Sequence, residues 1–114
     1  MVEAPRYEIV ITASAERSYF EVLDYVYTYH TLAVADQIAL ELLDYPQVLT
    51  SQPFIGKEET YLSKRKETYR YLVYHRTRQA TIKIIYYVDD TVGRIYITDF
   101  FPTEMNTEKI RKRS

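Results

Sequence analysis

The sequence predicts an α+β fold with the element order β-α-α-β-β-β, in which a helical hairpin packs on an antiparallel sheet. Three observations lead to this class. One β-branched run lies near the start of the chain, and two stretches with helical periodicity follow it. Three strand-like runs fill the second half and are separated by connections of hairpin length. We therefore expect the two helices to cover one face of a sheet built largely from the second half of the chain.

Residues 7–12 form the expected first strand, because β-branched residues dominate them and apolar side chains partly alternate. The first helix is expected over residues 13–29. Either Thr12 or Ser14 supplies its N-cap oxygen, and Glu16 lies in the first turn, where the helix dipole favours an anion. Its apolar face repeats at steps of three and four residues, through Ala15, Tyr19, Val22, Val26 and Tyr29.

A second helix is expected after Thr31, its N-cap, and it extends to about residue 45. The link between the helices is short, which predicts an antiparallel pair. Pro46 interrupts the helical pattern because it has no N–H group, so either the helix kinks there or a new turn begins. Residues 53–56 then end the helical half of the chain.

The three later strands are expected over residues 69–75, 82–88 and 94–100, after a polar, basic loop at 61–68. The short connections between the strands predict an antiparallel meander. Side chains alternate along a strand, so Arg70, Leu72 and Tyr74 share one face of the sheet. We expect one face of the sheet to pack under the helices and the opposite face to expose cations and tyrosines together.

A chain of 114 residues without cysteine predicts a single domain over residues 1–114, with a core at about 6–101 and a basic C-terminal tail at 102–114. Disulfides, a thiolate nucleophile and Cys-ligated zinc are excluded. His30 and His75 lie far apart in the sequence and the Asp89-Asp90 pair is typical of a turn, so we expect neither a metal nor a cofactor. The chain shows no secretion signal and no apolar run of membrane-spanning length, so we expect a cytoplasmic protein without membrane contact.

Charge is polarised along the chain, although the net charge is only −1. Residues 60–85 contain seven Lys or Arg residues and one acid, Glu67. Cations interleaved with tyrosines suit single-stranded RNA or another phosphate-rich surface, and the alternative is a solvated outer face. His75 is the candidate for proton transfer in this region, and the alternative for it is an exposed residue at a strand end.

Six segments carry a further signal in their order and spacing. They read YEIVIT at 7–12, AER at 15–17, LxxxPxxG at 49–56, YRxLV at 69–73, KIIYYV at 83–88 and IYITDFF at 95–101. In this order, across residues 6–110, the chain resembles the RelE/ParE toxin family of bacterial type II toxin–antitoxin modules.

The resemblance implies a cytoplasmic, growth-inhibiting toxin that a cognate antitoxin holds inactive, as a homodimer or within a toxin–antitoxin heterotetramer. RelE-like members enter the ribosome and cleave mRNA as metal-independent endoribonucleases, and this is the leading expectation. The alternative is a non-enzymatic, ParE-like poison of DNA gyrase, or a degenerate toxin that only binds its antitoxin.

The resemblance also assigns site residues. Arg70 and Lys83 match basic positions that stabilise the transition state of RNA cleavage. Two other positions that are usually basic hold Leu72 and Glu104 here, and Glu104 reverses the sign of the charge. Together with His75 and the cations of the 60–85 segment, this makes the catalytic candidates Arg70, Lys83 and His75, and the RNA- or phosphate-binding candidates Lys64, Arg65, Lys66, Arg76 and Arg78.

Overall fold

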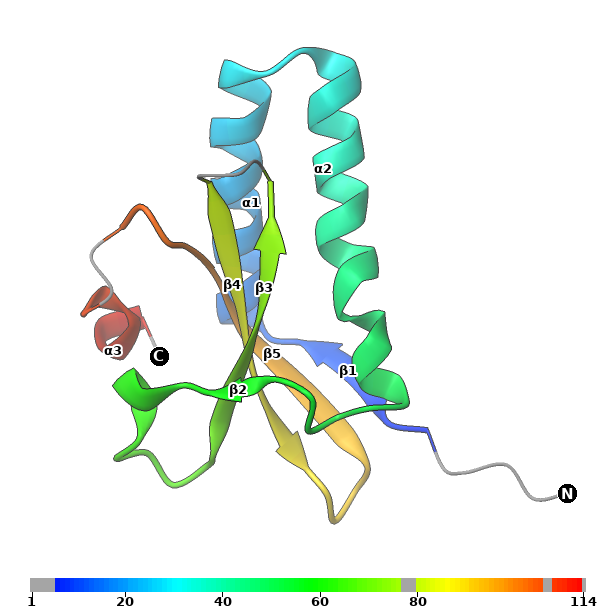
Figure 1. The fold of residues 1–114 in the computed structure, drawn as a ribbon, viewed down its shortest axis with the longest axis vertical. Helices are drawn as coiled ribbons and strands as arrows, with labels where there is room; N and C mark the ends of the chain where they lie inside the picture. The colour runs from blue at the N-terminus through cyan, green and yellow to red at the C-terminus, as the bar shows by residue number, and fades with distance from the viewer. Residues whose placement is uncertain (1–5, 77–79, 106–107, 114) are drawn as a thin grey trace, which may run out of the picture.

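The computed structural model describes residues 6–76, 80–105 and 108–113, and its fold is α+β. Two helices form a hairpin on one face of an open five-stranded sheet, whose strand order is β1-β5-β4-β3-β2 (Figure 1). The predicted class and the predicted helical hairpin are confirmed. The sheet is mixed rather than antiparallel, because the first strand runs parallel to its neighbour.

The hairpin consists of α1 (Ala13–Tyr29) and α2 (Leu32–Asp44), and both predicted N-caps are present. The Thr12 hydroxyl accepts a hydrogen bond from the Ala15 amide at 3.2 Å, and the Thr31 hydroxyl accepts one from the Val34 amide at 3.3 Å. After Asp44 the chain continues as a 3₁₀ helix, η1 (Tyr45–Thr50), with Pro46 in its first turn. Pro46 therefore begins a new turn, where its missing N–H group costs no hydrogen bond.

Strand β1 (Glu8–Ile11) pairs with β5 (Arg94–Pro102) in parallel, with Ile9 opposite Ile95. Parallel neighbours require a long crossover, and the helical hairpin and the meander together provide it. The expectation of an antiparallel sheet was wrong at this edge. Turn signals report only on strands that are adjacent in sequence, so they carried no information about this pairing.

The remaining strands form the predicted meander. Strands β3 (Tyr69–His75), β4 (Thr81–Asp89) and β5 are antiparallel, and a two-residue strand, β2 (Lys57–Glu58), extends the sheet beyond β3. Gly56, which precedes β2, passes very close to the Tyr86 side chain and the Tyr71 backbone. A Cβ atom there would lie 2.5 Å from the Tyr86 hydroxyl and 2.8 Å from the Tyr71 carbonyl oxygen, so the chain can pass only with glycine at this position.

Both faces of the sheet are covered. The face under the helices holds the larger core, in which Val22, Ile38, Ile84 and Phe100 are buried. On the opposite face, the short 3₁₀ helix η2 (Thr60–Leu62) and the C-terminal helix α3 (Lys109–Arg113) enclose a second core of Leu62, Ile85, Phe101 and Ile110 (Figure 1). The expectation of an open second face was therefore wrong here, because Ile110 of the predicted tail is fully buried.

Candidate functional site

The two principal catalytic candidates lie on opposite faces of the sheet. Arg70 stands opposite Tyr86, which belongs to the core under the helices. Lys83 stands opposite Phe101, which belongs to the second core beneath η2 and α3. Cross-strand partners share a face of a sheet, so the structure does not bring Arg70 and Lys83 together.

Lys83 is held in a nearly buried ion pair. Its Nζ atom lies 2.9 Å from Oε2 of Glu59, whose side chain is only 1% exposed, while the side chain of Lys83 is 15% exposed. The same Nζ atom lies 4.3 Å from the ring centroid of Tyr71 and 5.7 Å from that of Tyr61. A carboxylate and two aromatic faces thus balance the charge of Lys83, and this arrangement anchors η2 to β4.

Arg70 is half-buried and also has partners. Its guanidinium donates a hydrogen bond to the Gly56 carbonyl at 3.0 Å and lies 5.6 Å from the ring centroid of Phe54. These contacts hold the segment before β2 against the sheet. The geometry therefore gives Arg70 and Lys83 structural roles, and their catalytic roles stay predictions that this arrangement does not favour.

The next two candidates, His75 and Arg76, lie at the end of β3 and have different neighbours. His75 is exposed at the end of β3, beside Asp44 and Tyr45 at the end of α2. Arg76 pairs with Glu104, with a separation of 3.1 Å between guanidinium nitrogen and carboxylate oxygen. Glu104 lies at a position where the RelE/ParE resemblance leads us to expect a basic residue, and Arg76 balances its charge. Arg78 lies outside the described residues.

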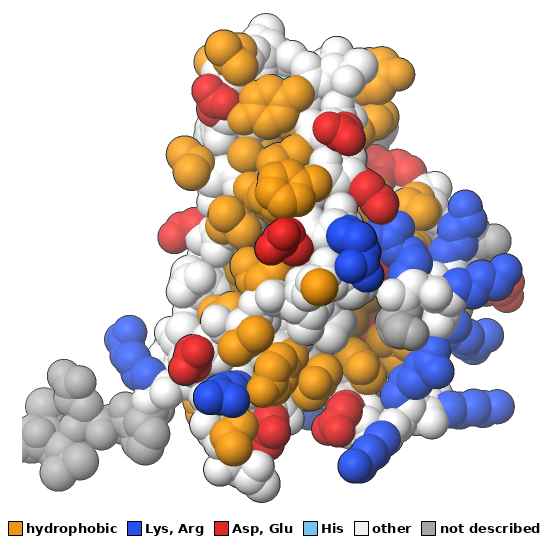
Figure 2. Space-filling model, turned by 180° about the vertical axis from the view of Figure 1, so that it is seen from behind, with side chains coloured by type: hydrophobic (Ala, Val, Ile, Leu, Met, Phe, Trp, Pro, Cys, Tyr) orange, Lys and Arg blue, Asp and Glu red, His pale blue; other side chains and the backbone are white. Residues whose placement is uncertain are grey.

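A group of exposed cations does come together, on the side of the molecule formed by η2, the loop after it and α3. The loop residues were predicted as phosphate-binding, whereas the helix residues lie in the predicted tail. Figure 2 shows Lys and Arg side chains gathered to one side of the helices. We call this surface the basic patch, and it comprises the exposed residues Lys64, Arg65, Lys66, Lys109, Arg111 and Lys112.

Two main-chain contacts fix the geometry of the basic patch. Arg65 donates a hydrogen bond to the Arg111 carbonyl at 2.7 Å, and Arg111 donates one to the Tyr61 carbonyl at 3.1 Å. A cavity of about 310 Å³ lies between these groups and also borders Lys64. The patch therefore combines positive charge with an aromatic ring and a concave surface, which are the features that bind a phosphate backbone and an unpaired base.

Sequence reasoning missed the contribution of α3 to this site. The signal was Ile110, a single apolar residue among the cations of the C-terminal segment. Because Ile110 inserts into the second core, its neighbour Arg111 is brought within hydrogen-bond distance of Arg65. A five-residue helix is too short for its periodicity to be recognised, so the sequence indicated a basic tail and not a folded element.

The helical hairpin presents a second distinctive surface, which is apolar. Figure 2 shows hydrophobic side chains spread over the two helices. The Tyr27 hydroxyl donates a hydrogen bond to Asp36 across the two helices at 2.5 Å, which fixes one of these rings. Among the exposed apolar side chains of the two helices are Phe20, Tyr27, Leu32, Leu40 and Leu43, each 37–70% exposed, and we call this set the hairpin outer face.

Several tyrosine hydroxyls on the sheet are held in their protonated form. Burial raises the pKa of Tyr86 and of Tyr69, and burial together with the hydrogen bond to Glu41 raises the pKa of Tyr74. The Tyr74 hydroxyl donates its hydrogen bond to Glu41 at 2.7 Å, whereas the Tyr86 hydroxyl accepts one from the Gly56 amide at 2.9 Å. Within the described residues, no group of three or more His, Asp or Glu side chains is arranged to hold a metal ion.

No protein-family model matches this sequence, and a search of curated proteins finds no similar one. The RelE/ParE resemblance therefore stays a prediction from the order and spacing of segments, to which the structure adds an α+β fold with a helical hairpin and a mixed sheet. Within residues 6–76, 80–105 and 108–113, no helix is both long and apolar enough to cross a membrane.

Proposed function

We propose that this protein is the toxin of a type II toxin–antitoxin module and that it inhibits translation by binding RNA of the ribosome or mRNA through the basic patch. The observation that carries the proposal is the assembly of six exposed cations from two segments far apart in the sequence. The protein as a whole has a net charge of −1, so this local excess of positive charge is not a consequence of overall composition.

The geometry favours RNA binding over RNA cleavage by the predicted residues. Arg70 and Lys83 face opposite sides of the sheet, so they do not act together on one phosphate. Lys83 is also neutralised by Glu59. Transition-state stabilisation requires donors that converge on one site, and Arg70 and Lys83 do not converge. We therefore expect inhibition of translation without dependence on the Arg70–Lys83 pair.

A protein target is the second candidate, and the hairpin outer face favours it. Exposed apolar side chains on neighbouring helices are typical of surfaces that bind other proteins. A gyrase-poisoning toxin or a degenerate toxin that only binds its antitoxin would use such a surface and would not need the basic patch.

The proposal is tested with a double charge reversal, Lys64→Glu/Lys66→Glu. Purified protein is titrated with a single-stranded RNA oligonucleotide and with ribosomes at several salt concentrations. We expect RNA binding to weaken by at least about tenfold, and the slope of log K against log salt to fall in magnitude by about 1.4, or about 0.7 for each lost phosphate contact. The control, Arg6→Glu/Arg17→Glu, changes the net charge equally but lies outside the patch.

Induction in bacteria separates the two candidates. If the proposal is right, the wild-type and control proteins stop the incorporation of labelled amino acids before growth arrest, and the patch variant does not. Relaxed or broken DNA with continuing protein synthesis would instead favour the gyrase candidate. A patch variant that stops translation as well as the wild type, or a wild-type protein that stops neither process, would overturn the proposal.

A further inference from the structure

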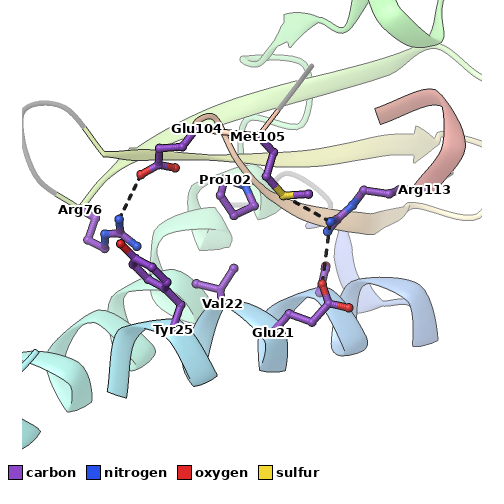
Figure 3. Close-up of a pocket in the computed structure, with 9 residues that line it drawn as sticks. Glu21, Val22, Tyr25, Arg76, Pro102, Glu104, Met105 and Arg113 are labelled. Atoms are coloured by element: carbon purple, nitrogen blue, oxygen red, sulfur yellow. Dashed lines mark hydrogen bonds and ion pairs between the residues drawn. The ribbon is translucent and has the colours of Figure 1, made fainter. Parts of the chain in front are cut away.

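Two of the cavities formed by the described residues are lined by arginine side chains, and they differ in charge. The first, of about 330 Å³, lies between α1 and the segment that follows β5 (Figure 3). Each guanidinium there has a carboxylate partner, since Arg76 lies 3.1 Å from Glu104 and Arg113 lies 3.8 Å from Glu21. The positive charge of this cavity is therefore balanced, and it has no surplus for an anion.

The second cavity, of about 310 Å³, belongs to the basic patch, and its charge is not balanced. Its lining contains three cations and no acid: Tyr61, Leu62, Ser63, Lys64, Arg65 and Arg111. The ion pairs among the described residues involve none of these three cations. Of the acids nearby in the sequence, Glu59 is paired with Lys83, and Glu67 and Glu108 do not line the cavity. The cavity therefore has a surplus of positive charge.

The two guanidinium groups of this cavity are held in place by the main chain. Arg65 donates a hydrogen bond to the Arg111 carbonyl at 2.7 Å, and Nε of Arg111 donates one to the Tyr61 carbonyl at 3.1 Å. A guanidinium has five N–H donors, so each arginine keeps further donors after these bonds. Leu62 and Ile110 anchor the two segments in the second core. Because both arginines are fixed in advance, binding an anion costs less side-chain entropy.

This surplus of charge favours a phosphate monoester over a diester. Each diester of an RNA backbone carries one negative charge, whereas a terminal monoester carries nearly two at neutral pH and presents three unsubstituted oxygens. Cations that line one cavity attract the more highly charged group more strongly, and arginine binds phosphate oxygens through paired N–H donors.

We propose that the cavity of the basic patch binds the terminal phosphate monoester of an RNA strand, with Lys64, Arg65 and Arg111 as the donors. The inference rests on the proposed function, because RNA is the molecule that the basic patch is proposed to bind. It adds that the protein recognises the end of a strand in preference to its interior.

The test compares single-stranded RNA oligonucleotides of equal total charge. Two strands of about 8 nucleotides carry a phosphate at the 5′ end or at the 3′ end. A third strand has hydroxyls at both ends and is two nucleotides longer, so its additional diesters replace the charge of the monoester. We expect at least one phosphorylated strand to bind about tenfold more tightly than the third, the effect of one hydrogen bond between charged groups. Equal affinities would overturn the inference and leave the proposed function standing.

Two matched lysine variants connect this preference with the cavity. Lys64→Gln removes a cation from the lining and should reduce the preference for a phosphorylated end to about threefold or less. Lys66→Gln removes an exposed cation of the basic patch that does not line the cavity, so it should weaken all strands alike and keep the preference. A preference that both variants keep, or that both lose, would overturn the assignment to this cavity.

A probe without RNA separates failure of this inference from failure of the proposed function. Phenyl phosphate is a monoester and methyl phenyl phosphate is the corresponding diester. In an NMR titration of the ¹⁵N-labelled protein we expect phenyl phosphate to bind with a dissociation constant of about 1 mM and the diester to bind more weakly. Equal binding of the two probes would overturn the inference. Binding of phenyl phosphate without binding of any RNA strand would overturn the proposed function and support a small phosphate monoester as the ligand.

Discussion

At the scale of single residues, the environment of Lys83 decides what this side chain can do. The ammonium group is bound by a carboxylate and packed against two aromatic rings, and Glu59 is almost completely removed from water. Removing the counter-charge of a buried carboxylate is strongly destabilising, because it leaves an uncompensated charge away from water. The contribution of Lys83 is therefore best measured through the free energy of unfolding.

We expect Lys83→Met to lower the free energy of unfolding by about 3–5 kcal/mol, because it leaves the Glu59 carboxylate buried without its counter-charge. The double variant Glu59→Gln/Lys83→Met removes both charges and should recover more than half of that loss. Urea unfolding followed by circular dichroism measures both. The matched control is Arg70→Met, at a half-buried arginine, with an expected loss of about 1–2 kcal/mol. Equal losses in all three variants would contradict this account.

Sequence reasoning placed Arg70 and Lys83 on their strands correctly but did not identify their partners. Side-chain alternation assigned Arg70 to the face of Leu72, and the register confirms this assignment. Alternation did not show whether Arg70 and Lys83 lie on the same face of the sheet, because that depends on how β3 and β4 pair. Glu59 lies in a segment without strand periodicity, so no local pattern connected it with Lys83.

At the scale of elements, α3 shows how one apolar residue can fold a charged segment. Ile110 is fully buried, and the residues on either side of it are exposed cations. The helix is held to the sheet by that side chain and by the ion pair between Arg113 and Asp99. The two long helices and the three meander strands were predictable, because each repeats its apolar period several times. Helix α3 and β2 are too short to do so.

We expect Ile110→Ala to lower the free energy of unfolding by about 2–5 kcal/mol, because it leaves a cavity in the second core. Lys109→Ala, at an exposed neighbour, should change it by no more than about 0.5 kcal/mol. Thermal and urea unfolding measure both variants. If the two substitutions have the same small effect, α3 does not contribute to the fold.

At the scale of the whole molecule, the buried tyrosines set a limit to stability in alkali. The pKa of Tyr74 is raised by burial and by its hydrogen bond to Glu41, and burial raises the pKa of Tyr86. In the unfolded chain both phenols ionise near pH 10, so above that pH the folded state keeps protons that the unfolded state has lost. Their contribution is therefore complete below about pH 10 and is lost as the pH rises further.

We expect the free energy of unfolding to fall as the pH is raised above about 10, by up to about 1.4 kcal/mol per pH unit for each such tyrosine. Tyr74→Phe and Tyr86→Phe should each make this dependence less steep. Tyr29→Phe, at a ring that is 69% exposed, is the control and should keep the wild-type slope. Urea unfolding at about pH 9, 10 and 11 tests this, and a flat profile for the wild type would contradict it.

The separation of charge described above also affects how the molecules behave toward one another. The helical hairpin, residues 13–44, carries six acids and one basic residue, whereas the basic patch has six cations. With a net charge of only −1, general repulsion between copies is weak, and the opposite poles attract head to tail. Dilute electrolyte screens this attraction, so the protein should be less soluble in salt-free buffer than in saline.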